Sequence, residues 1–239
     1  MIGDLFQKRK RLNSLVPNQG YLRGGRIEKK GKEMTVSLVS EGEQINYYTF
    51  TAGSLQEALR RMAQLGDRDG DGNHAASIDV RANILHNLQT GIVPGSTTQI
   101  QGMGWTATAL ITQGSLRYGF IYRFPNWSNI GSLSRPIQSE WQRYTRCLWT
   151  HERGHARAAM PVLRQYLRRF QELRIASMGA SSREAEEAAQ RELRVQVRDV
   201  YNLLAHDNQE TIRRYDIRTR HGRNQGAQLR TSIPRGSRH

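Results

Sequence analysis

Hydrophobic residues alternate with polar ones in the first half of the chain and recur with a helical period in the second half. In the first half, several segments combine the alternation with β-branched and aromatic residues, which is typical of strands. These segments are 34–40, 45–51, 76–84, 97–112 and 115–124. Turn-forming residues at 41–44 predict that the first two segments form a β-hairpin. One helix is expected among the strands, over residues 54–66, because Ser54 is a good N-cap residue and a glycine ends the pattern.

The second half predicts two long helices. Residues 137–176 contain almost no helix breakers, and their apolar side chains recur every three or four positions. Pro161 lies inside this segment and is expected to kink the helix or split it in two, because proline lacks a backbone donor and clashes with the preceding turn. A second helix with a charged outer face is predicted from Ser182 onward. Strands followed by long helices predict an α+β fold with an antiparallel sheet.

Positive charge is concentrated at the two ends of the chain. The sequence has 36 Lys and Arg against 21 Asp and Glu, a net charge of +15. Residues 1–33 carry nine basic and three acidic side chains, and residues 211–239 carry eight and one, so the middle has a net charge of only +2. We therefore predict a basic N-terminal arm at 1–33, a folded domain at 34–221 and a basic C-terminal tail at 222–239.

The composition excludes two classes of protein. A single cysteine, Cys147, rules out an intrachain disulfide framework. No run of 18 apolar residues is present, so we expect no membrane span. The first residues contain a basic cluster without the apolar stretch of a signal peptide, so none is expected.

Residues 151–155, HERGH, form an HExxH pattern inside the first long helix. His151 and His155 are four positions apart and project from one face of a helix, so both imidazoles can reach one zinc ion. Glu152 lies beside that face and is the candidate general base for a metal-bound water. The simpler alternative is an ordinary helix with two solvent-facing histidines and a salt-bridging glutamate.

The sequence also resembles a known family. HERGH, followed by YDIRTRHG at 215–222 and NQGA at 224–227, resembles an uncharacterised bacterial family described as predicted secreted zinc-dependent proteases. The resemblance runs from about residue 47 to about residue 228. It implies a zincin-like fold, Zn2+ as the cofactor, a protein or peptide substrate and export from the cell. It also implies that His151 and His155 are metal ligands and that Glu152 is the general base.

The third zinc ligand is left open between two residues at the end of the second helix. His221 is favoured, because it is a neutral zinc donor just past the helix end, and Asp216 is the rival. Whichever of them does not bind the metal is expected to orient a ligand or to stabilise the transition state. Tyr215 is a candidate hydrogen-bond donor to the oxyanion, with simple packing at the helix end as the alternative.

Two functions follow as hypotheses. The first is a zinc metallopeptidase whose substrate lies along an edge strand, as in zincins, with 115–124 as the candidate edge and a plain core strand as the alternative. The second is a non-catalytic binding or structural protein that uses its basic ends on nucleic acid, an anionic envelope or a larger particle. Neither end interleaves basic and aromatic residues, so the sequence favours the peptidase.

Overall fold

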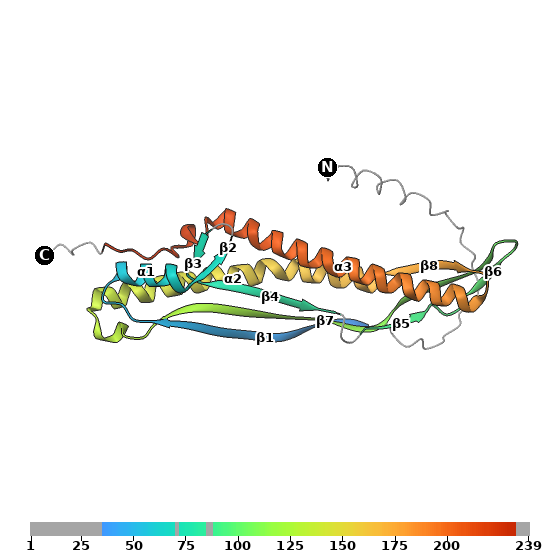
Figure 1. Ribbon diagram of the computed structural model, residues 1–239, viewed down its shortest axis with the longest axis horizontal. Coiled ribbons are helices and arrows are strands. Elements are labelled where there is room, and N and C mark those ends of the chain that lie inside the picture. The colour runs from blue at the N-terminus through green and yellow to red at the C-terminus, as the bar shows by residue number, and fades with distance from the viewer. Residues whose placement is uncertain (1–34, 70–71, 85–87, 233–239) are drawn as a thin grey trace, which may run out of the picture. The chain divides into compact units, whose positions relative to one another are not determined.

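The computed structural model describes residues 35–69, 72–84 and 88–232, which all belong to one compact unit, Met34–His239 (Figure 1). The predicted basic arm at 1–33 and the last seven residues of the predicted tail lie outside the described residues. In the described part of the chain, no helix is both long enough and apolar enough to cross a membrane.

One long strand, β7 (Gly104–Trp127), organises a six-stranded mixed sheet (Figure 1). Every other strand of this sheet pairs with β7; these are β1 (Thr35–Phe50), β4 (Ser77–Asn83), β5 (Gln89–Ile92), β6 (Thr98–Ile100) and β8 (Arg174–Gly179). β1 runs parallel to β7 and the others run antiparallel to it, so the fold is α+β but the purely antiparallel sheet is wrong. A separate two-stranded sheet consists of β2 (Asp67–Asp69) and β3 (Gly72–His74).

The predicted hairpin at residues 34–51 is also wrong. β1 is a single strand that pairs with β7 from Thr35 to Phe50, and its register shifts between Ser40 and Glu43. Gly42 lies in this shift with φ of 88°, a backbone conformation that glycine adopts without strain. The turn-forming residues therefore make a bulge that interrupts the pairing without reversing the strand.

The predicted strands at 97–112 and 115–124 correspond to β6, a turn and then β7, which continues through residue 114 without a break. β1 and β4 both pair with the 117–123 part of β7, so they flank this part on opposite sides. Residues 115–124 are therefore in the centre of the sheet, and their assignment as the substrate-binding edge is wrong. Among the described strands, β4 pairs with β7 alone and has an edge without a strand partner.

The described residues also form three α-helices: α1 (Leu55–Leu65), α2 (Arg135–Glu172) and α3 (Ser182–Thr219). The prediction of α1 is confirmed, with the Ser54 hydroxyl accepting a hydrogen bond from the Glu57 amide. α2 is continuous through Pro161, so the predicted split does not occur. Ala159 and Leu163, on either side of the proline, are fully buried, and their packing holds both halves of the helix in place.

The linker between α2 and α3 is strand β8, and α3 then returns along α2. A Ser181–Glu184 capping box starts α3, where the two residues satisfy each other's backbone amides. The long helices lie together along the sheet in Figure 1. This return brings the C-terminal end of α3 next to the middle of α2, where the HExxH residues lie.

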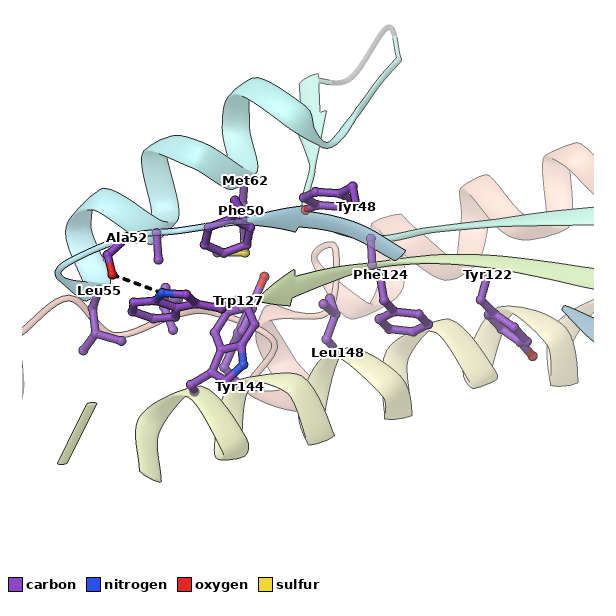
Figure 2. Packing of buried hydrophobic residues seen from close by; sticks show 14 of the residues in the cluster. Tyr48, Phe50, Ala52, Leu55, Met62, Tyr122, Phe124, Trp127, Tyr144 and Leu148 are labelled. Carbon is purple, nitrogen blue, oxygen red and sulfur yellow. Dashed lines mark hydrogen bonds between the residues drawn. The ribbon is translucent and has the colours of Figure 1, made fainter. Parts of the chain in front are cut away.

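The hydrophobic core has two parts. An aromatic cluster joins α1, the C-terminal ends of β1 and β7, and the start of α2 (Figure 2). Trp127 lies at its centre, stacks near Phe50 with ring centroids 5.9 Å apart, and donates a hydrogen bond from its indole nitrogen to the Ala52 carbonyl oxygen. A largely aliphatic cluster joins the other half of α2 to α3 and the remaining sheet. On α2, members of the aromatic cluster lie on both sides of the HExxH residues, with Leu148 before them and Ala156 and Ala159 after them.

Candidate metal centre

Helices α2 and α3 bring three potential metal donors together. His151 and His155 on α2 place their Nε2 atoms 3.3 Å apart. From the last turns of α3, Asp216 places Oδ1 3.2 Å from the first of these nitrogens and 3.1 Å from the second. Within the described residues, this is the group of His, Cys, Asp and Glu side chains whose geometry suits a metal ion.

The spacing of the three donor atoms fits a tetrahedral zinc ion. With bonds of 2.0–2.1 Å, two ligand atoms of a tetrahedral zinc site lie about 3.3 Å apart. The three measured separations of 3.1–3.3 Å agree with this value. If zinc were bound, these three side chains would be its protein ligands, the number that catalytic zinc sites use alongside a water or substrate.

Burial and mutual contact shape the electrostatics of the three donors. His151 and His155 are 5% and 3% exposed. Burial is the largest single influence on His151 and opposes the charged imidazolium. The hydrogen bond to Asp216, together with the nearby negative charges and the hydrogen bond to Gln225, outweighs burial and raises the pKa of His151. Burial also acts to raise the pKa of Asp216, and here the hydrogen bonds from both histidines outweigh it and hold that pKa well below its usual range.

Glu152 is the most unusual carboxyl group of the site. It is 3% exposed, and burial raises its pKa to about 7, opposed by the nearby charge of His151 and assisted by those of Asp216 and Asp67. A carboxyl group with a pKa near neutrality is suited both to accept a proton from water and to return it.

Tyr215 packs against both histidines. Its ring stacks on His151 with centroids 5.5 Å apart and meets His155 edge-on at 4.7 Å. The hydroxyl fits against Gly154, where an added Cβ would lie only 1.7 Å from Tyr215 Oη. The glycine inside the HExxH motif therefore lets α2 and α3 approach closely enough for Asp216, the next residue on α3, to reach the histidines.

The chain turns back over the site immediately after α3. Arg220 and His221 both have φ of 52°, and Gly222 has φ of 77°. This turn leads to a short 3-10 helix, η4 (Arg223–Gln225), whose last residue lies against His151. A side chain at Gly222 would put its Cβ 3.0 Å from His151 Cγ, so the turn passes directly over the imidazole.

Gln225 determines which nitrogen of His151 faces the other donors. Its Nε2 donates a hydrogen bond to Tyr215 Oη at 2.9 Å, so its Oε1 is left to accept from His151 Nδ1, also at 2.9 Å. With Nδ1 directed to Gln225, Nε2 is the ring nitrogen of His151 that faces His155 and Asp216, and its lone pair would bind a metal once its proton is lost. Histidine ligands of metals commonly have such an acceptor on the other ring nitrogen.

The structure groups Asp216, rather than His221, with the two histidines. His221 Nδ1 lies 4.0 Å from Asp216 Oδ1, and the His221 side chain is 43% exposed. His221 therefore lies at the solvent side of the three donors. Tyr215 packs at the helix end, and its hydroxyl accepts a hydrogen bond from Gln225, while its role as a donor to an oxyanion stays a prediction.

Sequence reasoning missed the residues that support the donors. No role was predicted for Gly154 or Gln225, although Gln225 lies in the NQGA motif. The segment that carries Gln225 is held to α2 by Arg143, which donates to the carbonyl oxygens of Gly226 and Gln228 at 2.8 and 2.7 Å. The only sequence signal for this support was the closeness of NQGA to the end of α3.

Fold and site together define a class: an α+β protein with a mixed sheet and a buried His-His-Asp cluster between two long antiparallel helices. More particularly, the chain belongs to a bacterial protein family of unknown function, DUF922, whose model matches residues 45–222. The match includes all three donors and Glu152, whereas Gln225 lies just beyond it. Neither the curated proteins nor the solved structures contain a match to this chain.

Proposed function

We propose that the protein is a zinc-dependent metallopeptidase, with His151, His155 and Asp216 as the zinc ligands and Glu152 as the general base. The observation that supports this most directly is the set of three donor atoms 3.1–3.3 Å apart beside a buried glutamate. The HExxH spacing and the resemblance to predicted zinc-dependent proteases support hydrolysis of a peptide bond.

In this proposal, zinc supplies Lewis acidity and lowers the pKa of a bound water. Glu152 takes the proton of the attacking water and then gives it to the leaving amine. Burial raises the pKa of Glu152 to about 7 and keeps its carboxyl group largely out of bulk water. His221, at the solvent side of Asp216, is the candidate donor to the carbonyl oxygen of the substrate.

A non-catalytic protein that binds through its basic ends gives no reason for the buried cluster. Burying polar and charged side chains costs free energy unless they are paired or bind a ligand. Such a protein would retain its binding with any apolar set at these three positions. The metallopeptidase function accounts for the cluster. The basic ends could in addition bind nucleic acid, and salt-dependent binding would reveal this.

The proposal is tested by metal analysis and proteolysis on the full-length protein. We expect about one zinc per chain, cleavage of casein by the zinc-loaded protein, loss of cleavage after chelation and recovery when zinc is returned. A correctly folded protein that binds no zinc at micromolar concentrations would exclude the function. Zinc binding without cleavage of casein or of a mixed peptide library would reduce the proposed function to metal binding alone.

A further inference from the structure

Five arginines form a stripe along the outer face of helix α2. The stripe consists of Arg146, Arg153, Arg157, Arg164 and Arg168. Successive members are seven, four, seven and four residues apart. With 3.6 residues per turn, these spacings keep all five within a sector of about 60° around the helix. All five side chains are exposed, so the stripe is a continuous basic surface about 33 Å long.

The charge of this stripe is hardly compensated. Between Arg146 and Arg168 the only acidic residue is Glu152, which is buried and therefore absent from the outer face. Among the residues that the structure describes, one ion pair reaches the stripe, from Arg153 to Glu43 at 4.0 Å. Members of the stripe that are four residues apart repel each other, and like charges at this spacing destabilise a helix. The stripe therefore weakens α2 unless a partner from outside offsets the repulsion.

Helix α3 carries a similar number of arginines but compensates them. It has seven arginines against eight acidic residues, whereas α2 has eight arginines against three. On α3, Glu187 pairs with Arg183 and Arg191 at 2.9 and 3.8 Å. Glu210 pairs with Arg213 at 3.6 Å. Mixed charges of this kind are typical of a solvated helix face. The small net charge of the middle of the chain thus conceals a division between a neutral helix and a basic one.

The composition of the outer face of α2 favours one kind of polyanion. The planar guanidinium group of arginine matches phosphate, which it binds through two parallel hydrogen bonds. A helix that binds a lipid surface needs exposed apolar side chains, but none of the exposed large apolar side chains of the described residues lies on α2. Single-stranded nucleic acid is usually held by bases stacked on aromatic rings, and the aromatic residues of α2 are buried or half-buried.

The length of the stripe agrees with a double-stranded partner. One turn of B-DNA measures about 34–36 Å along its axis, close to the length of about 33 Å that the stripe covers. A duplex carries one negative charge per about 1.7 Å of axis. Each of the five guanidinium groups can therefore meet a phosphate within one turn.

We propose that the outer face of α2 binds the phosphate backbone of double-stranded DNA through this arginine stripe, without reading the base sequence. The proposal goes beyond the peptidase function and does not rest on it. His151 and His155 point to Asp216 on α3, about half a turn around α2 from the stripe. Binding of this kind is driven by the release of counterions from the DNA, so it weakens steeply as salt is added.

Fluorescence anisotropy with a labelled duplex of about 20 base pairs, two turns, tests the stripe on the full-length protein. The α2 variant combines Arg157→Gln, Arg164→Gln and Arg168→Gln. The matched α3 variant combines Arg183→Gln, Arg191→Gln and Arg213→Gln, the arginines that are paired with glutamates. Both variants lose three positive charges and keep both basic ends of the chain, so a difference between them comes from the position of the charges.

We expect the α2 variant to bind the duplex at least roughly tenfold more weakly than the wild-type protein at physiological salt. A plot of log K against log salt concentration should become shallower by about 2.7, which is 0.9 for each of the three phosphate contacts removed. The α3 variant should stay within about twofold of wild type and keep its slope. The melting temperature of the α2 variant should stay the same or rise, because the substitutions relieve repulsion, and its zinc affinity should not change.

The outcomes separate the stripe from its alternatives. Equal weakening by both variants would mean that only the net charge matters, and it would overturn the proposal. Tighter binding to single-stranded DNA of the same length, or to vesicles of anionic lipid, would assign the stripe to another partner and overturn it as well. A selective loss of DNA binding in the α2 variant supports the stripe even if the protein neither binds zinc nor cleaves casein. If the α2 variant does not fold, Arg164→Gln alone is compared with Arg191→Gln, and only the first should lower the slope, by about 0.9.

Discussion

Two neighbouring stretches of helix α2 are equally buried and chemically opposite. At its start, Trp141 and Leu148 are 7% and 5% exposed and pack in the aromatic cluster. One turn later, His151, Glu152 and His155 are at most 5% exposed, and both histidines contact the carboxylate of Asp216. The helix is continuous across both stretches, so the difference lies in the side chains and not in the backbone.

The comparison separates what stabilises the fold from what serves the site. Each square ångström of apolar surface buried at the aromatic cluster contributes about 25 cal/mol to stability. Burying polar groups has the opposite sign unless a partner compensates it. Changes in the aromatic cluster should therefore lower the free energy of unfolding and leave metal binding unchanged in the folded molecules. Changes at the metal centre should weaken metal binding without lowering the free energy of unfolding.

The largest expected effect is that of Glu152→Gln. Loss of a general base reduces turnover by roughly 10²–10⁴-fold. The amide has the same shape as the carboxyl group and places no charge in a buried position. The melting temperature should therefore stay the same or rise. The measurement is kcat for casein-derived peptides, with zinc content determined on the same samples.

Glu172→Gln is the matched control for that variant, because Glu172 is the exposed last residue of the same helix. Its kcat should equal that of the wild-type protein. Residual activity above a tenth of wild type in Glu152→Gln would show that another group acts as the base.

Trp127→Ala should have the next largest effect, on stability alone. Removing a large buried aromatic side chain costs about 3–5 kcal/mol in free energy of unfolding, and this tryptophan also loses its bond to Ala52. Urea denaturation gives the change, and zinc titration of the folded fraction should give the wild-type dissociation constant. Tyr47→Ala, at an exposed aromatic residue on β1, should change stability by less than about 0.5 kcal/mol.

The third prediction distinguishes the two candidate ligands. Asp216→Asn should weaken zinc binding at least about 100-fold, the upper end of what residues outside the coordination sphere contribute. His221→Asn should weaken it less than about tenfold, because this side chain is not among the three grouped donors. Competition with a chromogenic chelator measures both, and the reverse order of effects would make His221 the ligand.

Predictability from the sequence follows how local each feature is. The start of α1 depends on Ser54 and its neighbours, and it was predicted correctly. The common helix face of His151 and His155 is equally local. β1 was mistaken for a hairpin because Gly42 looks like part of a turn, while pairing with residues about 77 positions later decides its path.

The order of preference between Asp216 and His221 could not be obtained from the sequence for the same reason. It depends on the contact of α3 with α2, which the fit of Tyr215 against Gly154 determines. Both residues are near the end of a helix, and either one suits zinc. Only the packing of two helices that are distant in sequence brings one of them to the histidines.

A smaller effect is expected at Gln225, which supports a ligand without being one. Gln225→Ala removes the acceptor for His151 Nδ1, and changes of this kind weaken metal binding about 10-fold. Gln225→Glu keeps an acceptor and should restore affinity to within about threefold of wild type. Gln228→Ala is the control, because Gln228 binds Arg143 through its backbone carbonyl oxygen, which the substitution keeps. In the cobalt-substituted protein, a changed visible spectrum for Gln225→Ala would distinguish loss of ligand orientation from loss of fold.

The smallest effect should come from Glu140, which holds Arg143 and the backbone of Arg230 at the start of α2. Hydrogen bonds from Arg143 hold the pKa of Glu140 below its usual range, and Arg143 in turn holds the segment that carries Gln225. A group whose pKa is lowered by folding contributes stability above its unfolded pKa, about 4.3, and loses it as the pH falls through the folded value. Glu140→Gln should therefore be about 1 kcal/mol less stable than wild type at pH 7, since the pair is partly exposed. The difference should shrink below pH 4.

Urea denaturation at several pH values measures this difference in stability, with exposed Glu192→Gln as the control. A deficit that stays constant with pH would mean that Glu140 acts through packing and not through its charge.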